Sequence, residues 1–132
     1  MSQAQVDTIR RYLKCLHATD VPGLVDCFAP EGIVKSPFLG TMKARAFFPK
    51  LAGASSQSVI TPIDLFQSVE AGGTVERVAA YFRYDWTLKD GQVVTFTCVD
   101  IFEFEAGSNR IDSMTIVYDT HPLREEVGDK YA

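Results

Sequence analysis

The sequence predicts an α+β fold in which three N-terminal helices pack on a curved antiparallel β-sheet that is mixed at its edge. The hydrophobic period is helical up to Leu51 and becomes two from Gln57 onward. Helices followed by a run of strands indicate a sheet with its helices on one face. We expect residues 1–132 to form one domain, because a chain of this length buries about two-thirds of its unfolded surface.

The helices are predicted from capping residues and apolar spacing. A capping-box pattern opens the first helix at Ser2. Pro22 follows a capping side chain and predicts a short second helix, which extends as far as Phe28. Thr41 can cap a third helix over residues 42–51, and the following segment 53–56 is expected to be a loop. The apolar side of the first helix contains Val6, Ile9, Leu13 and Leu16, with Tyr12 at its border.

Strands are predicted wherever apolar and polar residues alternate. Residues 32–38 are expected to form a short edge strand, because Pro37 cannot donate to a central ladder. The dipeptide Asp90-Gly91 predicts a hairpin with a type I′ turn. The four long strands are predicted at 58–69, 75–89, 93–105 and 110–120.

Asp100 lies in the middle of the most aromatic strand face of the chain. In the run VVTFTCVDIFEFE, its same-face neighbours on either side are apolar. Burying an ionised carboxylate without a partner costs several kcal/mol, so such a group either finds partners or takes up a proton. Two interpretations stay open: Asp100 is a structural group with a partner or solvent contact, or it is a functional carboxyl group in an apolar cleft.

Composition excludes several classes of function. The net charge of −4 without a Lys/Arg cluster argues against nucleic-acid binding. The chain has no apolar run of membrane-spanning length and its first residues are polar, so we expect a cytoplasmic protein with no membrane partner. The widely spaced cysteines and two histidines indicate neither a disulfide framework nor a metal site, and no cofactor is expected. A cysteine–histidine nucleophile is a minor alternative.

Two stretches carry a resemblance to a known family. RYLKCLHATDVPGLVDCFA, residues 11–29, resembles the opening of the ketosteroid isomerase branch of the NTF2-like superfamily, which includes the SnoaL-like cyclases. VVTFTCVDIFEFEAGSNRIDSM, residues 93–114, resembles the closing hairpin of that branch. The resemblance covers nearly the whole chain and implies a cone-shaped NTF2-like fold, whereas many different chemistries share this scaffold.

The resemblance implies specific roles for two residues. Tyr12 matches the oxyanion-hole tyrosine of the isomerases, and Asp100 matches the protonated aspartic acid that donates the second hydrogen bond. We therefore expect both to be catalytic residues if the protein is an enzyme. The inward-facing pattern and the resemblance together predict that further side chains contact the ligand: Phe28, Ser36, Phe38, Phe48, Phe82, Tyr84, Trp86, Cys98, Phe102, Met114 and Tyr118.

The sequence departs from the isomerases at the general base. Ser36 stands where those enzymes keep an aspartate, and a serine hydroxyl cannot remove a carbon-bound proton unaided. Asp64, Asp119 and His121 are alternative bases by residue type, although each is more readily explained as a solvated surface group. The related epoxide hydrolases place an arginine where this chain has Cys98, which argues against their chemistry. True steroid isomerisation is therefore not expected.

Two functional classes remain, with a small apolar or aromatic ligand as the expected partner in both. The protein is either an isomerase-, cyclase- or lyase-type enzyme acting on a cyclic ketone, enone or polyketide, or a binding protein without turnover. An interaction module is a third reading that is compatible with both. The outward face of the sheet is expected to form a homodimer through Tyr81, Thr97, Val99 and Ile101.

Overall fold

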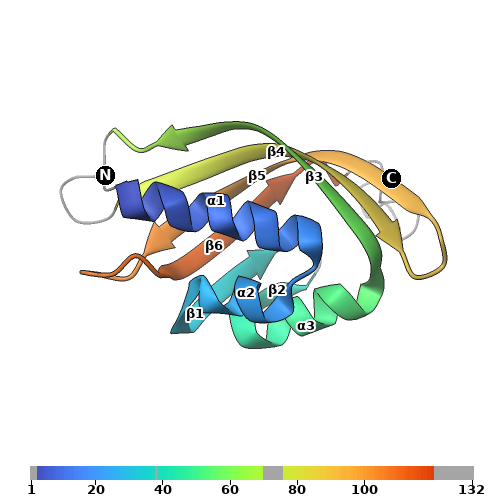
Figure 1. Cartoon of the computed structure of the whole chain (residues 1–132), viewed down its shortest axis with the longest axis horizontal. Helices are drawn as coiled ribbons and strands as arrows, with labels where there is room; N and C mark the ends of the chain where they lie inside the picture. The colour runs from blue at the N-terminus through green and yellow to red at the C-terminus, as the bar shows by residue number, and fades with distance from the viewer. Residues whose placement is uncertain (1–2, 38, 70–75, 121–132) are drawn as a thin grey trace, which may run out of the picture.

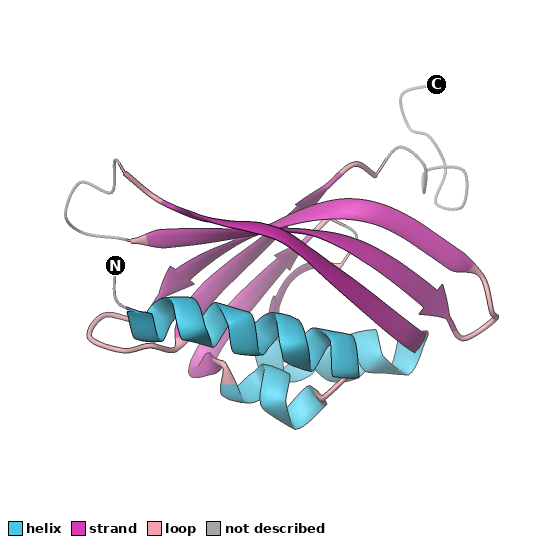
Figure 2. Cartoon of the chain, turned by 45° about the horizontal axis from the view of Figure 1, so that its top comes forward, coloured by secondary structure: helices cyan, strands magenta, loops and turns pink. Residues whose placement is uncertain are grey.

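The structure, a computed structural model, describes residues 3–37, 39–69 and 76–120. Three helices lie on one side of a six-stranded sheet that curves over them (Figures 1 and 2). In chain order the elements are α1 (Gln3–Ala18), α2 (Val21–Asp26), β1 (Phe28–Ser36), β2 (Gly40–Lys43), α3 (Ala44–Ala54), β3 (Ser55–Gln67), β4 (Arg77–Leu88), β5 (Val93–Phe104) and β6 (Ile111–Tyr118). The predicted α+β class is confirmed.

The strands form one mixed sheet in the order β2-β1-β6-β5-β4-β3. β1 and β6 are parallel, and every other neighbouring pair is antiparallel. The four predicted long strands are therefore confirmed as β3 to β6, with ends within three residues of the predicted positions. None of the helices within the described ranges is long and apolar enough to cross a bilayer.

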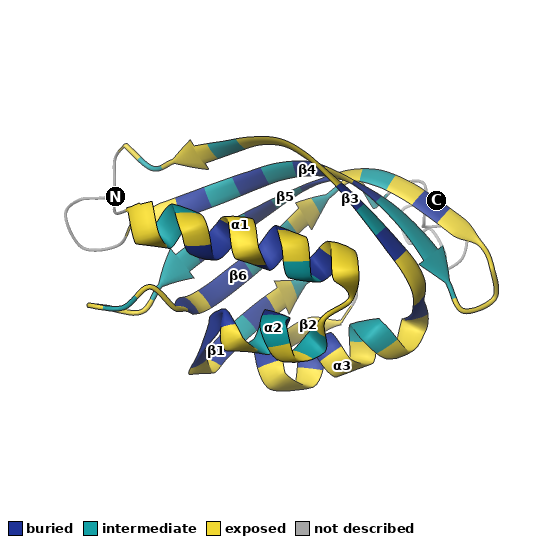
Figure 3. Ribbon diagram, in the orientation of Figure 1, coloured by how far each residue is buried: buried dark blue, intermediate teal, exposed yellow. Residues whose placement is uncertain are grey.

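Helix α1 packs its apolar side against the concave face of the sheet. Ile9, Tyr12, Leu13 and Leu16 are at most 5 % exposed, and buried and exposed residues alternate along α1 in Figure 3. Strand alternation turns the even-numbered residues of β5 towards the same space. Asp100 pairs with Ala80 of β4 on one side and Ile116 of β6 on the other, so it lies well inside the sheet.

Helix α2 begins as the sequence predicts, because the Asp20 carboxylate accepts a hydrogen bond from the Gly23 backbone N–H at 3.0 Å. It ends earlier than expected. α2 stops at Asp26, and Phe28 is the first residue of β1.

The prediction that residues 32–38 form an edge strand was wrong. β1 pairs with β6 on one side and with β2 on the other, so β2 is the edge strand. Pro37 lies just beyond β1, where its missing N–H interrupts no ladder.

The predicted third helix and the loop after it also need correction. Residues 40–43 form β2, because Met42 pairs with Val34 of β1, and α3 starts only at Ala44. α3 contains Pro49 and continues to Ala54, beyond the predicted end at Leu51, and it joins β3 without a loop.

The hairpin after β4 forms where predicted, with a different turn. Gly91 has a φ of 89°, whereas Asp90 is not among the residues with positive φ, so the type I′ assignment is wrong. The turn is closed by a hydrogen bond from the Gly91 N–H to the Leu88 carbonyl oxygen at 3.0 Å.

Candidate functional site

A cavity of about 360 Å³ lies between the concave face of the sheet and helices α1 and α3. Its size is within the usual range for small-molecule sites, and its wall is mainly apolar and aromatic. The lining consists of Tyr12, Leu16, Ser36, Leu39, Phe47, Lys50, Leu51, Ala54, Phe82, Tyr84, Trp86, Phe96, Cys98, Asp100, Ile116 and Tyr118.

A larger groove of about 920 Å³ runs between α1 and β3. It contains Arg10, Lys14, His17 and Asp64, and it includes neither Tyr12 nor Asp100. His17 has a structural contact there, because its Nδ1 accepts a hydrogen bond from the Ile60 N–H at 3.0 Å. We therefore place the candidate site in the smaller cavity, where polar groups converge within an apolar wall.

Asp100 is the buried carboxyl group of this cavity, with 2 % of its surface exposed. The Cys98 thiol donates a hydrogen bond to its Oδ1 at 3.1 Å. Burial raises the pKa of Asp100 from 3.8 to about 7, and the thiol acts in the opposite direction because it stabilises the carboxylate. A substantial fraction of Asp100 therefore carries its proton at neutral pH.

Tyr12 reaches the same cavity from α1 and is also 2 % exposed. Its ring packs edge-on against Phe28, Phe48 and Phe102, with centroids 6.3, 6.0 and 5.1 Å away. Burial, and secondarily the charge of Asp100, raise the pKa of the Tyr12 hydroxyl well above its usual value. Tyr12 is therefore a neutral phenol that can donate a hydrogen bond into the cavity.

Two other aromatic lining residues form hydrogen bonds to serine side chains of β3. The Tyr84 hydroxyl hydrogen-bonds to the Ser58 hydroxyl at 3.0 Å, and the Trp86 indole N–H donates to Ser55 Oγ at 2.7 Å. These bonds hold the rings in place. Burial also raises the pKa of Tyr84 to about 12, so its hydroxyl stays protonated.

One wall of the cavity is a stack of aromatic rings. The Phe96 ring lies against Tyr84 with a centroid distance of 5.1 Å and against Tyr118 with a distance of 4.5 Å, both at 29°. Such a wall offers flat apolar surface to a ring-shaped ligand.

Ser36 lies at the end of β1 on the rim of this cavity. Its Oγ accepts a hydrogen bond from the Leu39 backbone N–H at 3.4 Å, across the turn that leads to β2. The hydroxyl oxygen is thus engaged in the turn, and no carboxylate occupies this position.

The predicted site residues fall into three groups. Eight of them line the cavity: Tyr12, Ser36, Phe82, Tyr84, Trp86, Cys98, Asp100 and Tyr118. Four are at most 2 % exposed in the hydrophobic core and are not on the lining: Phe28, Phe48, Phe102 and Met114. Phe38 lies outside the described residues.

The sequence reasoning missed the contribution of α3. Phe47, Lys50, Leu51 and Ala54 recur at helical spacing and all line the cavity. The remaining unpredicted lining residues are Leu16, Leu39, Phe96 and Ile116. The spacing on α3 was available in the sequence, but the helix was predicted to end at Leu51.

Neither of the two alternative bases in the described part of the chain, Asp64 and Asp119, lies on the cavity wall. Asp64 lines the groove beside α1, and its Oδ1 accepts a hydrogen bond from the Leu65 N–H at 2.8 Å. Asp119 is exposed and is not among the lining residues, and His121 lies outside the described residues. Cys98 is a poor nucleophile, because burial and Asp100 raise the pKa of its thiol. Within the described ranges, no group of three His, Cys, Asp or Glu side chains could hold a metal ion.

The sequence model of the SnoaL-like domain matches residues 9–113. The chain belongs to the SnoaL-like domain family. The matched segment includes both Tyr12 and Asp100. No curated protein matches this SnoaL-like chain.

Solved structures similar to the SnoaL-like chain confirm the predicted NTF2-like fold. An NTF2-like protein of unknown function from Burkholderia pseudomallei has a TM-score of 0.76 at 21% identity, with 98% of this chain and 100% of that chain covered. The epoxide hydrolase/cyclase-like enzyme SalBIII, which functions in pyran ring formation in the polyether salinomycin, has a TM-score of 0.73 at 19% identity over 89% and 92% of the chains. A Catenulispora acidiphila protein with a ketosteroid isomerase-like fold, in complex with trimethylamine, has a TM-score of 0.71 at 13% identity over 86% and 85%.

Proposed function

We propose that this SnoaL-like protein binds a small cyclic ketone, enone or polyketide-type ligand in the cavity. Tyr12 and protonated Asp100 donate hydrogen bonds to one oxygen of the ligand. The observation that carries the proposal is the carboxyl group of Asp100, which is 2 % exposed in an apolar cavity and accepts a hydrogen bond from the Cys98 thiol.

The two donors suit an oxygen on which negative charge develops. Preorganised donors in a water-poor site stabilise an enolate or phenolate more strongly than they would in water. The pKa of Asp100 is raised to about 7, and a bound oxyanion would favour the protonated form further because like charges repel. Ligand binding and protonation of Asp100 therefore support each other.

The chemistry that we propose is of the isomerase, cyclase or lyase type on an enolisable ligand. Ser36 does not provide the general base of steroid isomerisation, so the proton passes to another acceptor, such as a group of the ligand or water. The same observation favours an alternative function, in which the protein holds the ligand through Tyr12 and Asp100 without turnover.

We also propose that the outer face of the sheet joins two copies of the chain. Val117 and Phe66 are 48% and 51% exposed on this face. The strand register adds Tyr81, Thr97, Val99 and Ile101 to the same face. The expected result is a dimer by sedimentation and a monomer after Val117→Lys; a monomeric wild-type protein would refute this arrangement.

Fluorescence titration with 2-naphthol tests the proposed site. Tyr12→Phe should weaken binding about tenfold, because one hydrogen bond to a developing charge is lost. Asp100→Leu should weaken it at least as much, whereas Asp100→Asn keeps a donor and should have a smaller effect. Tyr81→Phe, which removes a hydroxyl from the outer face of β4, serves as the matched control and should bind as the wild type does.

Two results would contradict this proposal. One is the absence of 2-naphthol binding to a folded wild-type protein. The other is equal binding by the wild type and the Tyr12→Phe/Asp100→Leu double variant. Loss of binding in the double variant alone would support a screen of cyclic enones for turnover.

A further inference from the structure

Lys50 interrupts an otherwise apolar helix face. On α3, Phe47, Leu51 and Ala54 line the cavity at helical spacing, and Lys50 shares this stripe. A stripe that faces a cavity normally carries apolar residues, so a cation at this position needs a reason. Lys50 and Asp100 are the sole Lys, Arg, His, Asp or Glu side chains among the described lining residues.

The two charged residues lie at different depths. Asp100 is 2 % exposed, as is Tyr12, whereas Lys50 is exposed to solvent and still belongs to the cavity wall. Lys50 therefore lies where the cavity wall meets solvent, whereas the two hydrogen-bond donors, Tyr12 and Asp100, are buried. The wall between them consists largely of aromatic and aliphatic side chains.

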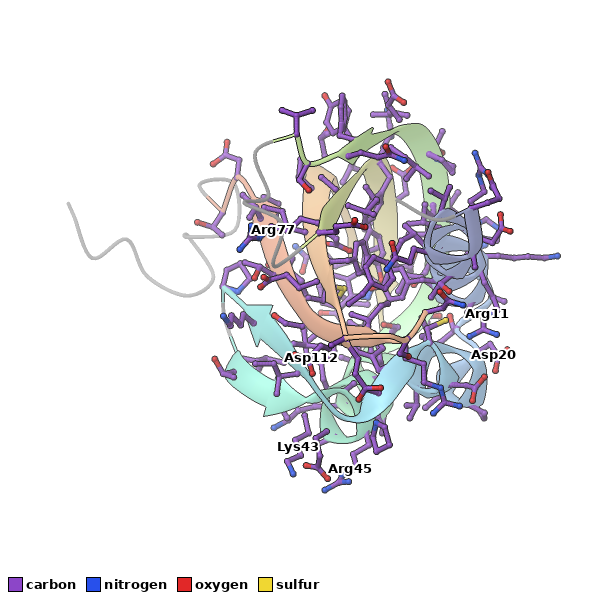
Figure 4. The ribbon with its side chains drawn as sticks, turned by 90° about the vertical axis from the view of Figure 1, so that its left-hand side faces the viewer. Arg11, Asp20, Lys43, Arg45, Arg77 and Asp112 are labelled. Atoms are coloured by element: carbon purple, nitrogen blue, oxygen red, sulfur yellow. The ribbon has the colours of Figure 1, made fainter. Side chains whose placement is uncertain are left out.

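The other cations around α3 have carboxylate partners. Lys43 and Arg45 both bind Glu31, and the two labelled side chains lie near each other at one end of the molecule in Figure 4. Lys50 makes no ion pair with any of the described residues. An unpaired cation at the rim of an apolar cavity is suited to bind an anionic group of a ligand.

We propose that the ligand is a cyclic ketone or phenol that carries a carboxylate at the end opposite its ring oxygen, and that Lys50 selects for this carboxylate. The inference rests on the function proposed above, because it assumes that the ring oxygen lies at Tyr12 and Asp100. Lys50 is thus a specificity-determining residue, since it contacts a part of the ligand remote from the reacting oxygen.

A purely structural role for Lys50 makes a different prediction. Lysine stems often cover apolar surface while the ammonium group stays in water. In that case the affinity for the ligand would depend on the methylene groups of Lys50 and not on its charge. Lys50→Met keeps a long unbranched stem and removes the charge, so it separates the two roles.

The experiment compares 6-hydroxy-2-naphthoate with its methyl ester, which have the same hydroxyl group and differ in charge at the opposite end of the ring system. The wild type should bind the acid about tenfold more tightly than the ester, because a charge-assisted hydrogen bond is gained. Lys50→Met should bind both equally, with ester affinity unchanged, and Lys50→Arg should keep the preference. Lys35→Met, which removes an exposed positive charge from β1 at a residue that is not on the cavity lining, is the matched control and should also keep the preference.

The outcomes distinguish the two proposals. The proposed function stands if the wild type binds the ester and Tyr12→Phe weakens ester binding. In that case, the role of Lys50 is refuted if the wild type shows no preference for the acid, or if Lys50→Met retains that preference. If neither compound binds, or if Tyr12→Phe leaves ester binding unchanged, both proposals are overturned.

Discussion

Substitution of Asp100 by asparagine should change how the stability of the protein depends on pH. Asparagine has nearly the same shape as aspartic acid and does not titrate. In the folded wild type, burial raises the pKa of Asp100 to about 7, whereas the unfolded chain has a value near 3.8. The folded state therefore binds more protons than the unfolded state between these two pH values.

The sign and the size of the effect follow from this proton difference. The contribution of Asp100 to stability is fully present below about pH 4 and is lost as the pH rises through about 7. Each pKa unit corresponds to about 1.4 kcal/mol, so the wild type should lose about 4 kcal/mol of unfolding free energy across this window relative to Asp100→Asn.

Urea unfolding at several pH values between 4 and 8.5 measures this difference, with the fluorescence of Trp86 and circular dichroism as probes. Asp85→Asn is the control from the neighbouring strand. Hydrogen bonds from Arg83 and Thr95 lower the pKa of Asp85, so its contribution is present above the unfolded pKa and is lost as the pH falls. If the stability of the wild type and of Asp100→Asn changed in parallel over the whole range, the burial argument for Asp100 would be refuted.

Three further substitutions test the packing that supports the site, each by urea unfolding. Phe102→Ala should cost about 3–5 kcal/mol, because the ring is fully buried against Tyr12; a cost below about 1 kcal/mol would contradict this packing. Asp20→Ala should cost about 1 kcal/mol through loss of the α2 cap, and an unchanged stability would show that the cap contributes nothing. Gly32→Ala should cost about 1–3 kcal/mol, because the added Cβ would lie 2.8 Å from the Ile111 carbonyl oxygen. Gly53→Ala is its control: it meets nothing within 4 Å and should be neutral or stabilising, and the same loss in both variants would refute the steric argument.

The position of Asp100 could be predicted from the alternation of side chains along its strand. Period-two alternation placed this carboxyl group on the apolar face of β5, and the structure confirms that it is buried. The same reasoning located β4 and β6, because each long strand has its own local pattern and a glycine-containing break. These properties depend on residues that are near each other in sequence.

The division between core and cavity was not predictable in the same way. Phe96 and Phe102 lie on the same face of β5, yet Phe96 lines the cavity and Phe102 is fully buried in the core. Alternation assigns a face, but it does not say whether a helix side chain fills the space above that face. For Phe102 this space is occupied by the Tyr12 ring.

Local signals in the sequence were therefore sufficient to predict the class of fold, the long strands, the cap of α2 and the inward direction of Asp100. Three features became known only from the folded structure: β1 lies between β2 and β6, α3 contributes to the cavity wall, and Lys50 lies at the rim of the cavity. The physical reason is that hydrogen bonding and side-chain periodicity act over a few residues, whereas strand order and empty volume result from the packing of segments far apart in the chain.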